Sequence, residues 1–121
     1  MKNNKTVTAL NAVVATTTSS AIDVKYAEKI TLLLTQTGHS SGNFVVTVSG
    51  SVDDSTYVDL NILRDNATGV LTLVSSKTLS ADGSVLVSID LEGTGIALTS
   101  IKVTGTRTTD GTLTAVVYIE N

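Results

Sequence analysis

Apolar residues occupy every second position through most of this 121-residue chain. Because successive side chains of a strand point to opposite faces, this spacing predicts strands that are each buried on one face. Weaker versions of the pattern lie at residues 69–79, 5–15 and 20–26. The clear runs are Ile30, Leu32 and Leu34; Phe44, Val46 and Val48; Val58, Leu60 and Ile62; Val85, Val87, Ile89 and Leu91; Ile101 and Val103; and Leu113, Ala115, Val117 and Ile119.

The composition also favours strands, since 21 threonines and 16 valines carry branched Cβ atoms that suit a pleated surface. Short alternating runs separated by Gly, Asp and Ser clusters are typical of sandwiches and barrels. We therefore predict an all-β fold, an antiparallel two-sheet sandwich that is jelly-roll-like, with about seven to nine short strands. Jelly-roll and immunoglobulin-like topologies both fit this pattern.

One segment also fits a helix. In residues Ala21–Leu34, the side chains Ile22, Tyr26, Ile30 and Leu33 could share a helical face. The run Leu32-Leu33-Leu34 between two threonines fits a buried strand better, so we predict a strand there.

Two Asp-Gly turns suggest hairpins with three-residue loops. Because the apolar residues on both sides of each turn are odd-numbered, a two-residue loop would place them on opposite faces. A loop at Thr109-Asp110-Gly111 pairs Val103 with Val117, and a loop at Ala81-Asp82-Gly83 pairs Leu79 with Val85, with a glycine for the left-handed position. Lys77 and Arg107 fall on the apolar parity, which predicts strand ends or an open face.

No linker or charge block divides the chain, so we expect one β-sandwich domain over residues 16–121. Residues 1–15 begin with Lys2 and Lys5 before a partly apolar stretch that loosely imitates a signal peptide. Polar residues interrupt that stretch, and we interpret residues 1–15 as mature protein, an N-terminal arm or first strand.

Composition excludes several classes of function. Without cysteine there is no disulfide framework, thiolate metal site or cysteine nucleophile. A net charge of −3 with eight cationic side chains argues against nucleic acid as a partner. The sequence contains no apolar run long enough to span a membrane. We also expect no cofactor.

The candidate catalytic residues are few. His39 is the single histidine, and its neighbour Ser40 points to the other side of an extended chain, which is poor geometry for a nucleophile and its base. The acids Asp53, Asp54, Asp59 and Asp65 cluster in sequence and could supply oxygens to calcium, although no EF-hand spacing is present and aspartates are common in turns. We therefore expect no enzyme and leave calcium binding by Asp53, Asp54 or Asp59 open.

A sugar-binding face needs exposed aromatic platforms. Phe44 lies on the core parity, which leaves Tyr26, Tyr57 and Tyr118 on three separate segments. Structural tyrosines are the simpler interpretation.

The segment from Ser41 to Val58 reads SGNFVVTVSGSVDDSTYV. It resembles a strand–turn–strand pattern of small β-sandwich phage head proteins, and the cysteine-free Thr/Ser/Val/Gly composition is similar to that of bacteriophage capsid decoration (cement) proteins. This resemblance implies a jelly-roll-like subunit, trimeric, bound to the outside of a capsid lattice. It transfers no catalytic residue.

We therefore expect a non-enzymatic virion structural protein, a decoration subunit on the capsid surface that binds the major capsid protein through many modest contacts. Lys2, Asn3, Asn4 and Lys5 are the candidate contacts with an acidic shell. The alternatives are a self-assembling extracellular filament or tube subunit that uses strand addition, and a carbohydrate- or ligand-binding sandwich module.

Overall fold

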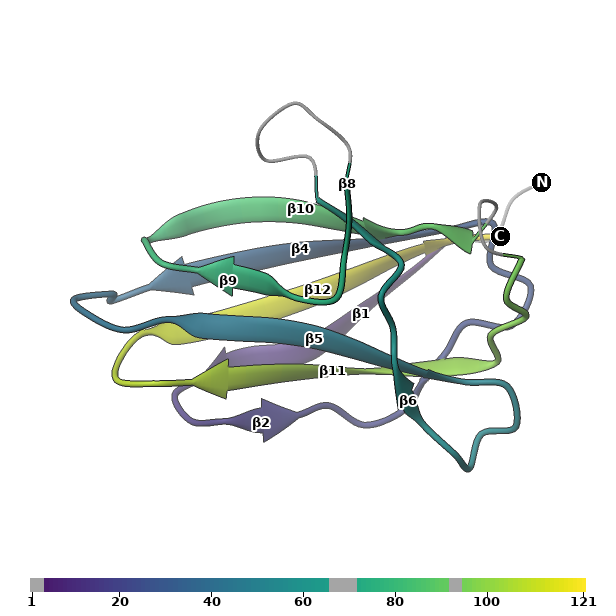
Figure 1. Cartoon of the computed structure of the whole chain (residues 1–121), viewed down its shortest axis with the longest axis horizontal. Coiled ribbons are helices and arrows are strands. Elements are labelled where there is room, and N and C mark those ends of the chain that lie inside the picture. Colours follow the sequence, from purple (N-terminus) through teal and green to yellow (C-terminus); the bar gives the residue numbers. More distant parts are fainter. Residues whose placement is uncertain (1–3, 66–71, 92–94) are drawn as a thin grey trace.

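The computed structural model describes residues 4–65, 72–91 and 95–121, which form two antiparallel sheets packed face to face (Figure 1). Sheet A contains, in spatial order, β1 (Asn4–Val13), β12 (Thr112–Glu120), β4 (Lys29–Thr37), β10 (Gly83–Ile89), β7 (Leu63–Asp65) and β8 (Thr72–Val74). Sheet B contains β2 (Thr17–Thr18), β11 (Ser100–Arg107), β5 (Phe44–Ser51) and β6 (Val58–Asp59), with β3 (Ile22–Asp23) beside β11 and β9 (Lys77–Leu79) beside β5. The predicted all-β sandwich is confirmed.

The strand order is that of a jelly roll. When β2 and β3 are taken as one interrupted strand, and β6 and β9 as another, sheet A reads β1-β12-β4-β10 and sheet B reads β2/β3-β11-β5-β6/β9. Consecutive strands therefore alternate between the sheets except for β5 and β6/β9, which are neighbours in sheet B, and this is the order of a jelly roll. The hairpin of β7 and β8 departs from this scheme because the chain leaves sheet B after β6 and returns at β9. Such short pieces raise the number of strands above the predicted range.

The predicted alternation places the core between the sheets. In β4, β5, β11 and β12 every second residue is buried, and the intervening residues are mostly half-exposed. Phe44, Val48, Ile101 and Leu113 are fully buried at the centre. The run at 58–62 is regular in sequence only: Val58 is 63% exposed, whereas Leu60 and Ile62 are buried between β6 and β7.

Both predicted hairpins are wrong in their pairing. Val103 of β11 pairs with Val48 of β5, whereas Val117 of β12 pairs with Leu32 of β4 in the other sheet. Likewise Leu79 of β9 pairs with Phe44, and the next strand, β10, pairs with β4. Each Asp-Gly turn therefore crosses from one sheet to the other.

The positions of the apolar residues do not distinguish a hairpin from a connection between two sheets. In both cases the apolar residues before and after the turn face one core. The inferred backbone at the turn is nevertheless correct, because Gly111 has a φ of 100° and Gly83 a φ of 137°.

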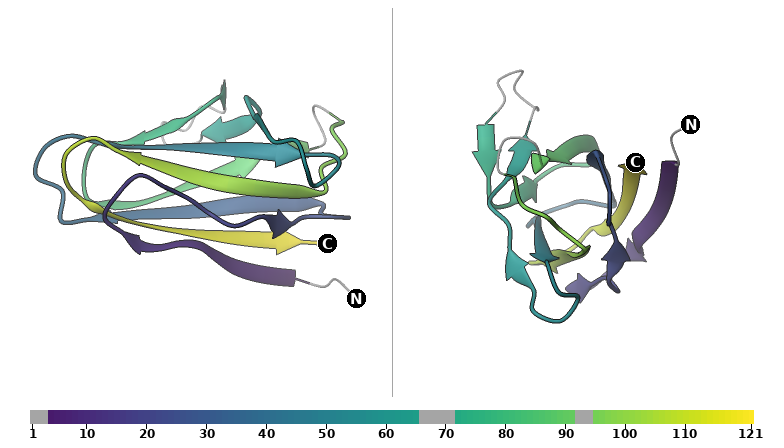
Figure 2. Two further views of the ribbon diagram at one scale, coloured as in Figure 1. Left: turned by 90° about the horizontal axis from the view of Figure 1, so that it is seen from below. Right: turned by 90° about the vertical axis from the view of Figure 1, so that its right-hand side faces the viewer.

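Two further expectations are confirmed. The segment at 21–34 forms β3 and β4 instead of a helix. Lys77 begins β9 and Arg107 ends β11, so both lie at strand ends. In the described part of residues 1–15 the chain forms β1, which lies beside the C-terminal strand β12 (Figure 2). Among the described residues, no helix is long and apolar enough to cross a membrane.

Gly105 tests the close packing of the sheets. It lies on the inward parity of β11, and a Cβ atom there would lie 2.6 Å from Leu113 Cδ2 of the opposite sheet. We expect Gly105→Val to lower the free energy of unfolding by about 1–3 kcal/mol through overpacking, measured by urea denaturation. The control is Thr106→Val at the next, outward position, which we expect to change stability little. Equal effects at the two positions would contradict the inward placement of Gly105.

Candidate interaction surfaces

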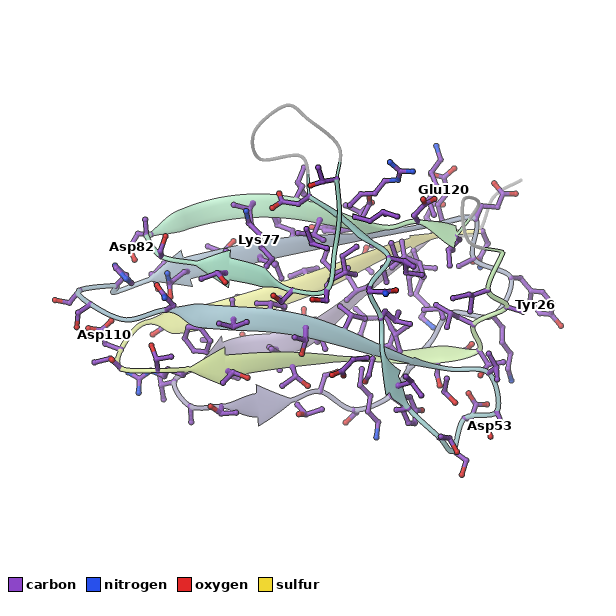
Figure 3. The ribbon with its side chains drawn as sticks, in the orientation of Figure 1. Tyr26, Asp53, Lys77, Asp82, Asp110 and Glu120 are labelled. Carbon is purple, nitrogen blue, oxygen red and sulfur yellow. The ribbon has the colours of Figure 1, made fainter. Side chains whose placement is uncertain are left out.

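Several of the connections that cross between the sheets lie at one end of the sandwich. The loop between β4 and β5 lies there between two turns that each provide an aspartate, Asp82 and Asp110 (Figure 3). Asp82 Oδ1 accepts a hydrogen bond from the backbone N–H of His39 at 2.8 Å, and Asp110 accepts from those of Ser40 and Ser41 at 3.1 and 3.0 Å. The two turns therefore hold the third loop by the same chemistry.

The imidazole of His39 takes part in the hydrogen bonds of this loop. His39 Nε2 lies 2.7 Å from the carbonyl oxygen of Gly42, and the Ser40 backbone is bound to Asp110. The hydrogen bonds from the N–H groups of Ser41 and Ser40 favour the charged carboxylate and lower the pKa of Asp110 below its ordinary value. The loop is held by these contacts, and we interpret His39 as part of that structure.

Asp110 therefore links stability to pH. Because its pKa is lower in the folded state, its contribution to stability is complete above the unfolded-state pKa and is lost as the pH falls through the folded-state value. We expect Asp110→Ala to lower stability at pH 7, with the difference from wild type disappearing in acid. Urea denaturation between pH 2 and 7 measures this, with the exposed Asp59 as the matched position for Asp59→Ala. A difference for Asp110→Ala that stays constant with pH would contradict the linkage.

The predicted acidic cluster does not assemble in space as a metal site. Asp53 accepts hydrogen bonds from the Thr56 and Ser55 backbones, which lower its pKa, and also from Ser51 Oγ. Asp54 accepts from Thr99 Oγ1 at 2.7 Å, which lowers its pKa as well. Among the residues that the structure describes, no group of three or more His, Cys, Asp or Glu side chains could hold a metal ion. These aspartates shape the turn after β5.

The aromatic residues do not form a common platform. Phe44 is buried, as its parity predicted. Tyr57 donates to or accepts from Ser100 Oγ at 2.8 Å, and Lys102 Nζ lies 4.3 Å from its ring centre. Tyr118 lies on the outer face of sheet A, and Tyr26 lies on a loop at the end of the sandwich opposite Asp82 and Asp110 (Figure 3).

The N-terminal contact residues are described in part. Asn4 and Lys5 begin the edge strand β1 and are exposed, and Lys5 Nζ donates to the carbonyl oxygen of Asp23 at 3.2 Å. Lys2 and Asn3 lie outside the described residues. β1 carries register shifts after Thr8 and Leu10, so its regular pairing with β12 is confined to its first half.

The outer side of four strands of sheet A, β1, β12, β4 and β10, presents uncharged side chains up to its last row, and we call it the uncharged face. Its outward residues are threonines, serines and a few apolar residues at alternate positions of four adjacent strands. They are Thr6 and Thr8 of β1; Thr112, Thr114, Val116 and Tyr118 of β12; Thr31, Leu33, Thr35 and Thr37 of β4; and Ser84, Leu86 and Ser88 of β10.

The register arranges this face in rows across the strands. Val116, Leu33 and Leu86 are direct neighbours and form an apolar row at its centre. In a neighbouring row the hydroxyls of Thr35 and Ser84 are 2.9 Å apart. Charge appears in the last row, which Asn4, Glu120 and Lys29 form, and at the edge of the face, where Arg64 of β7 lies beside Ser88 and pairs with Asp90 at 2.7 Å.

The outer side of sheet B differs. There Lys102, Ser49 and Asp59 form a row of their own across β11, β5 and β6, so both signs of charge lie within the surface. Hydroxyl residues still dominate the remainder, as in the pair of Thr18 and Thr104, whose oxygens are 2.9 Å apart.

An apolar surface lies at the end of the sandwich opposite the loop that Asp82 and Asp110 hold. Two open hollows of about 500 and 490 Å³ adjoin there, and both are lined by Ile96 and Leu98. Tyr26 lies at the first hollow beside Lys25, and Val52 and Val58 line the second together with Asp53 and Asp59. We call Tyr26, Val52, Val58, Ile96 and Leu98 the apolar end. Exposure is high for Tyr26 at 90% and for both valines at 63%.

Tyr26 adopts a conformation that glycine or asparagine usually supplies. The Ala27 N–H donates to the Val24 carbonyl at 3.1 Å and closes a turn in which Tyr26 is the third residue, with a φ of 63°. A side chain at positive φ costs about 1–2 kcal/mol, and an exposed ring recovers little of this by packing. Strain at exposed residues is concentrated at functional sites.

We therefore expect Tyr26→Gly to leave the free energy of unfolding unchanged or to raise it by up to about 1 kcal/mol. Thermal and urea unfolding measure this. Tyr57→Gly, at a half-buried tyrosine with a hydrogen bond, is the control and is expected to destabilise. A loss of stability for Tyr26→Gly would show that the ring is held by packing.

Comparison with known proteins adds one structural relationship. No protein-family model matches the chain, and no curated protein matches its sequence. Among solved structures, the crystal structure of the SPBc2 prophage-derived protein YomS is similar, with a TM-score of 0.70 and 11% sequence identity. The alignment covers 100% of this chain and 96% of that chain. At this identity, the similarity shows that the two chains share a fold.

Neither of the two surfaces described above was predicted from the sequence. For the uncharged face a signal existed, because the polar positions between the apolar ones are Thr, Ser or apolar in the runs at 31–37, 84–88 and 112–118. For the apolar end no local signal existed, because its residues come from three separate segments of the chain and meet only in the fold.

Proposed function

We propose that the chain is a structural, non-enzymatic protein of a bacteriophage virion, and that it decorates the outside of the capsid by binding the major capsid protein. The observation that carries this proposal is the surface chemistry: a sandwich with one uncharged face and one apolar end. Soluble proteins generally cover such areas with a partner. The fold shared with a prophage-derived protein supports a phage origin.

The apolar end is the surface that we assign to the shell. It presents Tyr26, Val52 and Val58 outward, and a tyrosine and branched apolar residues around hollows are typical of contact sites. Asn4 and Lys5 begin β1 at the same end of the sandwich and can add polar contacts to an acidic shell (Figure 1). Each contact is small, and many copies on one lattice give a stable layer through multivalency.

Particles of the phage or prophage that encodes the chain test the proposal. We expect antibody-coupled gold to label the capsid surface. We also expect particles that are produced without the gene, and therefore lack the protein, to bind the purified protein when it is added. Label on the tail, or none on the particle, would contradict a decoration role. Fibres or tubes formed by the purified protein alone would favour the filament alternative instead.

A matched pair of variants locates the contact. Val52 at the apolar end and Val14 at the opposite end are similarly exposed, at 63% and 59%. We expect Val52→Glu to reduce binding to particles that lack the protein at least tenfold, because a charge must then lose its water in the contact, whereas Val14→Glu keeps wild-type binding. Equal binding by the two variants would exclude the apolar end as the contact.

A further inference from the structure

We propose that the uncharged face of sheet A is the interface of a two-fold symmetric homodimer. The proposal concerns purified protein and does not depend on the virion role. It replaces the trimer that the resemblance to phage proteins implies with a two-fold symmetric dimer.

Charge favours contact between two copies through this face. The chain carries a net charge of −3, so two copies repel weakly at most surfaces. On the uncharged face the outward residues of β12, β4 and β10 are Thr, Ser, Val, Leu and Tyr up to the last row. Two copies that meet through this face bury no ionised group along three rows of side chains. A surface without charge is complementary to itself, which is what an isologous two-fold contact requires.

The apolar row lies at the centre of the uncharged face. Val116 and Leu33 lie side by side on β12 and β4, the two central strands of the four that form the face. A two-fold axis that runs parallel to the strands between β12 and β4 places Val116 of each copy against Leu33 of the other. Leu86 then faces Thr8 of the second copy at the outer strands.

The charged end row selects this axis. Glu120 and Lys29 are cross-strand neighbours on the same two central strands. The strand-parallel axis places Glu120 of each copy near Lys29 of the other, so opposite charges meet twice. An in-plane axis perpendicular to the strands would instead lay this row over the threonines at the far end of the face and bury the charges against hydroxyls.

The size of the face is sufficient for a reversible dimer. Four strands about 4.8 Å apart and seven residues of about 3.3 Å each give a flat area of roughly 440 Å² per copy. Two copies therefore cover about 900 Å² before side-chain relief is added, which is below the roughly 1,200 Å² of stable interfaces and in the range of weak, transient ones. We expect a dimer that dissociates on dilution.

Sedimentation velocity over a concentration series tests the proposal. We expect wild type to move from monomer to dimer, and Val116→Lys to weaken the dimer at least tenfold because two lysines would meet within the apolar row. Val45→Lys is the matched control, because Val45 is an outward, half-exposed valine on β5, a central strand of sheet B. It is expected to dimerise like wild type.

A second variant protects the test against misfolding. Leu86 is 49% exposed, so Leu86→Lys leaves the folded monomer intact and should also weaken the dimer. A monomer at the highest soluble concentration, a trimer, or equal effects of Val116→Lys and Val45→Lys would each overturn the proposal.

The axis has its own test. Lys29→Glu places like charges together twice and is expected to weaken the dimer about threefold or more, and adding Glu120→Lys in the same chain is expected to restore it. A double variant as weak as the single one would overturn the strand-parallel axis.

Discussion

The structure depends on burial of one face of each sheet against the other. Alternate side chains of β4, β5, β11 and β12 fill the space between the sheets, and the removal of this apolar surface from water is the main favourable term in folding. Because the same alternation that buries one residue exposes the next, it also fixes which residues are presented outward. The core and the outer faces are therefore specified together, and the uncharged face is a direct consequence of the residues placed between the core positions.

The jelly-roll order follows from how the chain moves between the two layers. Connections at one end cross from sheet to sheet, and the carboxylates of Asp82 and Asp110 hold the loop between β4 and β5 through its backbone N–H groups. At the opposite end the loops carry the apolar residues and the strained Tyr26. The molecule thus has one end fixed by internal hydrogen bonds and one end that presents apolar side chains outward.

The sequence predicted the layers of this fold better than its connections. Period-two patterns identified the buried residues of β4, β5, β11 and β12, because side-chain direction along a strand is a local property. They did not distinguish a hairpin from a connection between sheets, since Val103 and Val117 face the same core in either case. The resemblance to phage head proteins agreed with the jelly roll that was found, and the candidate shell contacts at Asn4 and Lys5 remain predictions.

The interaction surfaces were harder to predict for a related reason. The apolar end requires the three-dimensional meeting of Tyr26, Val52 and Ile96, which no spacing in the sequence reveals. The uncharged face requires knowledge of which strands are neighbours, and the predicted hairpins paired those strands wrongly. Once the order β1-β12-β4-β10 is known, the outward residues combine into one surface.

Intermolecular nuclear Overhauser effects in a mixed sample, with half of the protein isotopically labelled and half unlabelled, test most directly whether this surface joins two copies. The account predicts cross-peaks between the methyl groups of Val116 in one molecule and Leu33 in another at concentrations where the dimer forms. Intermolecular cross-peaks to Val45 on sheet B, or none at all when sedimentation shows a dimer, would contradict it.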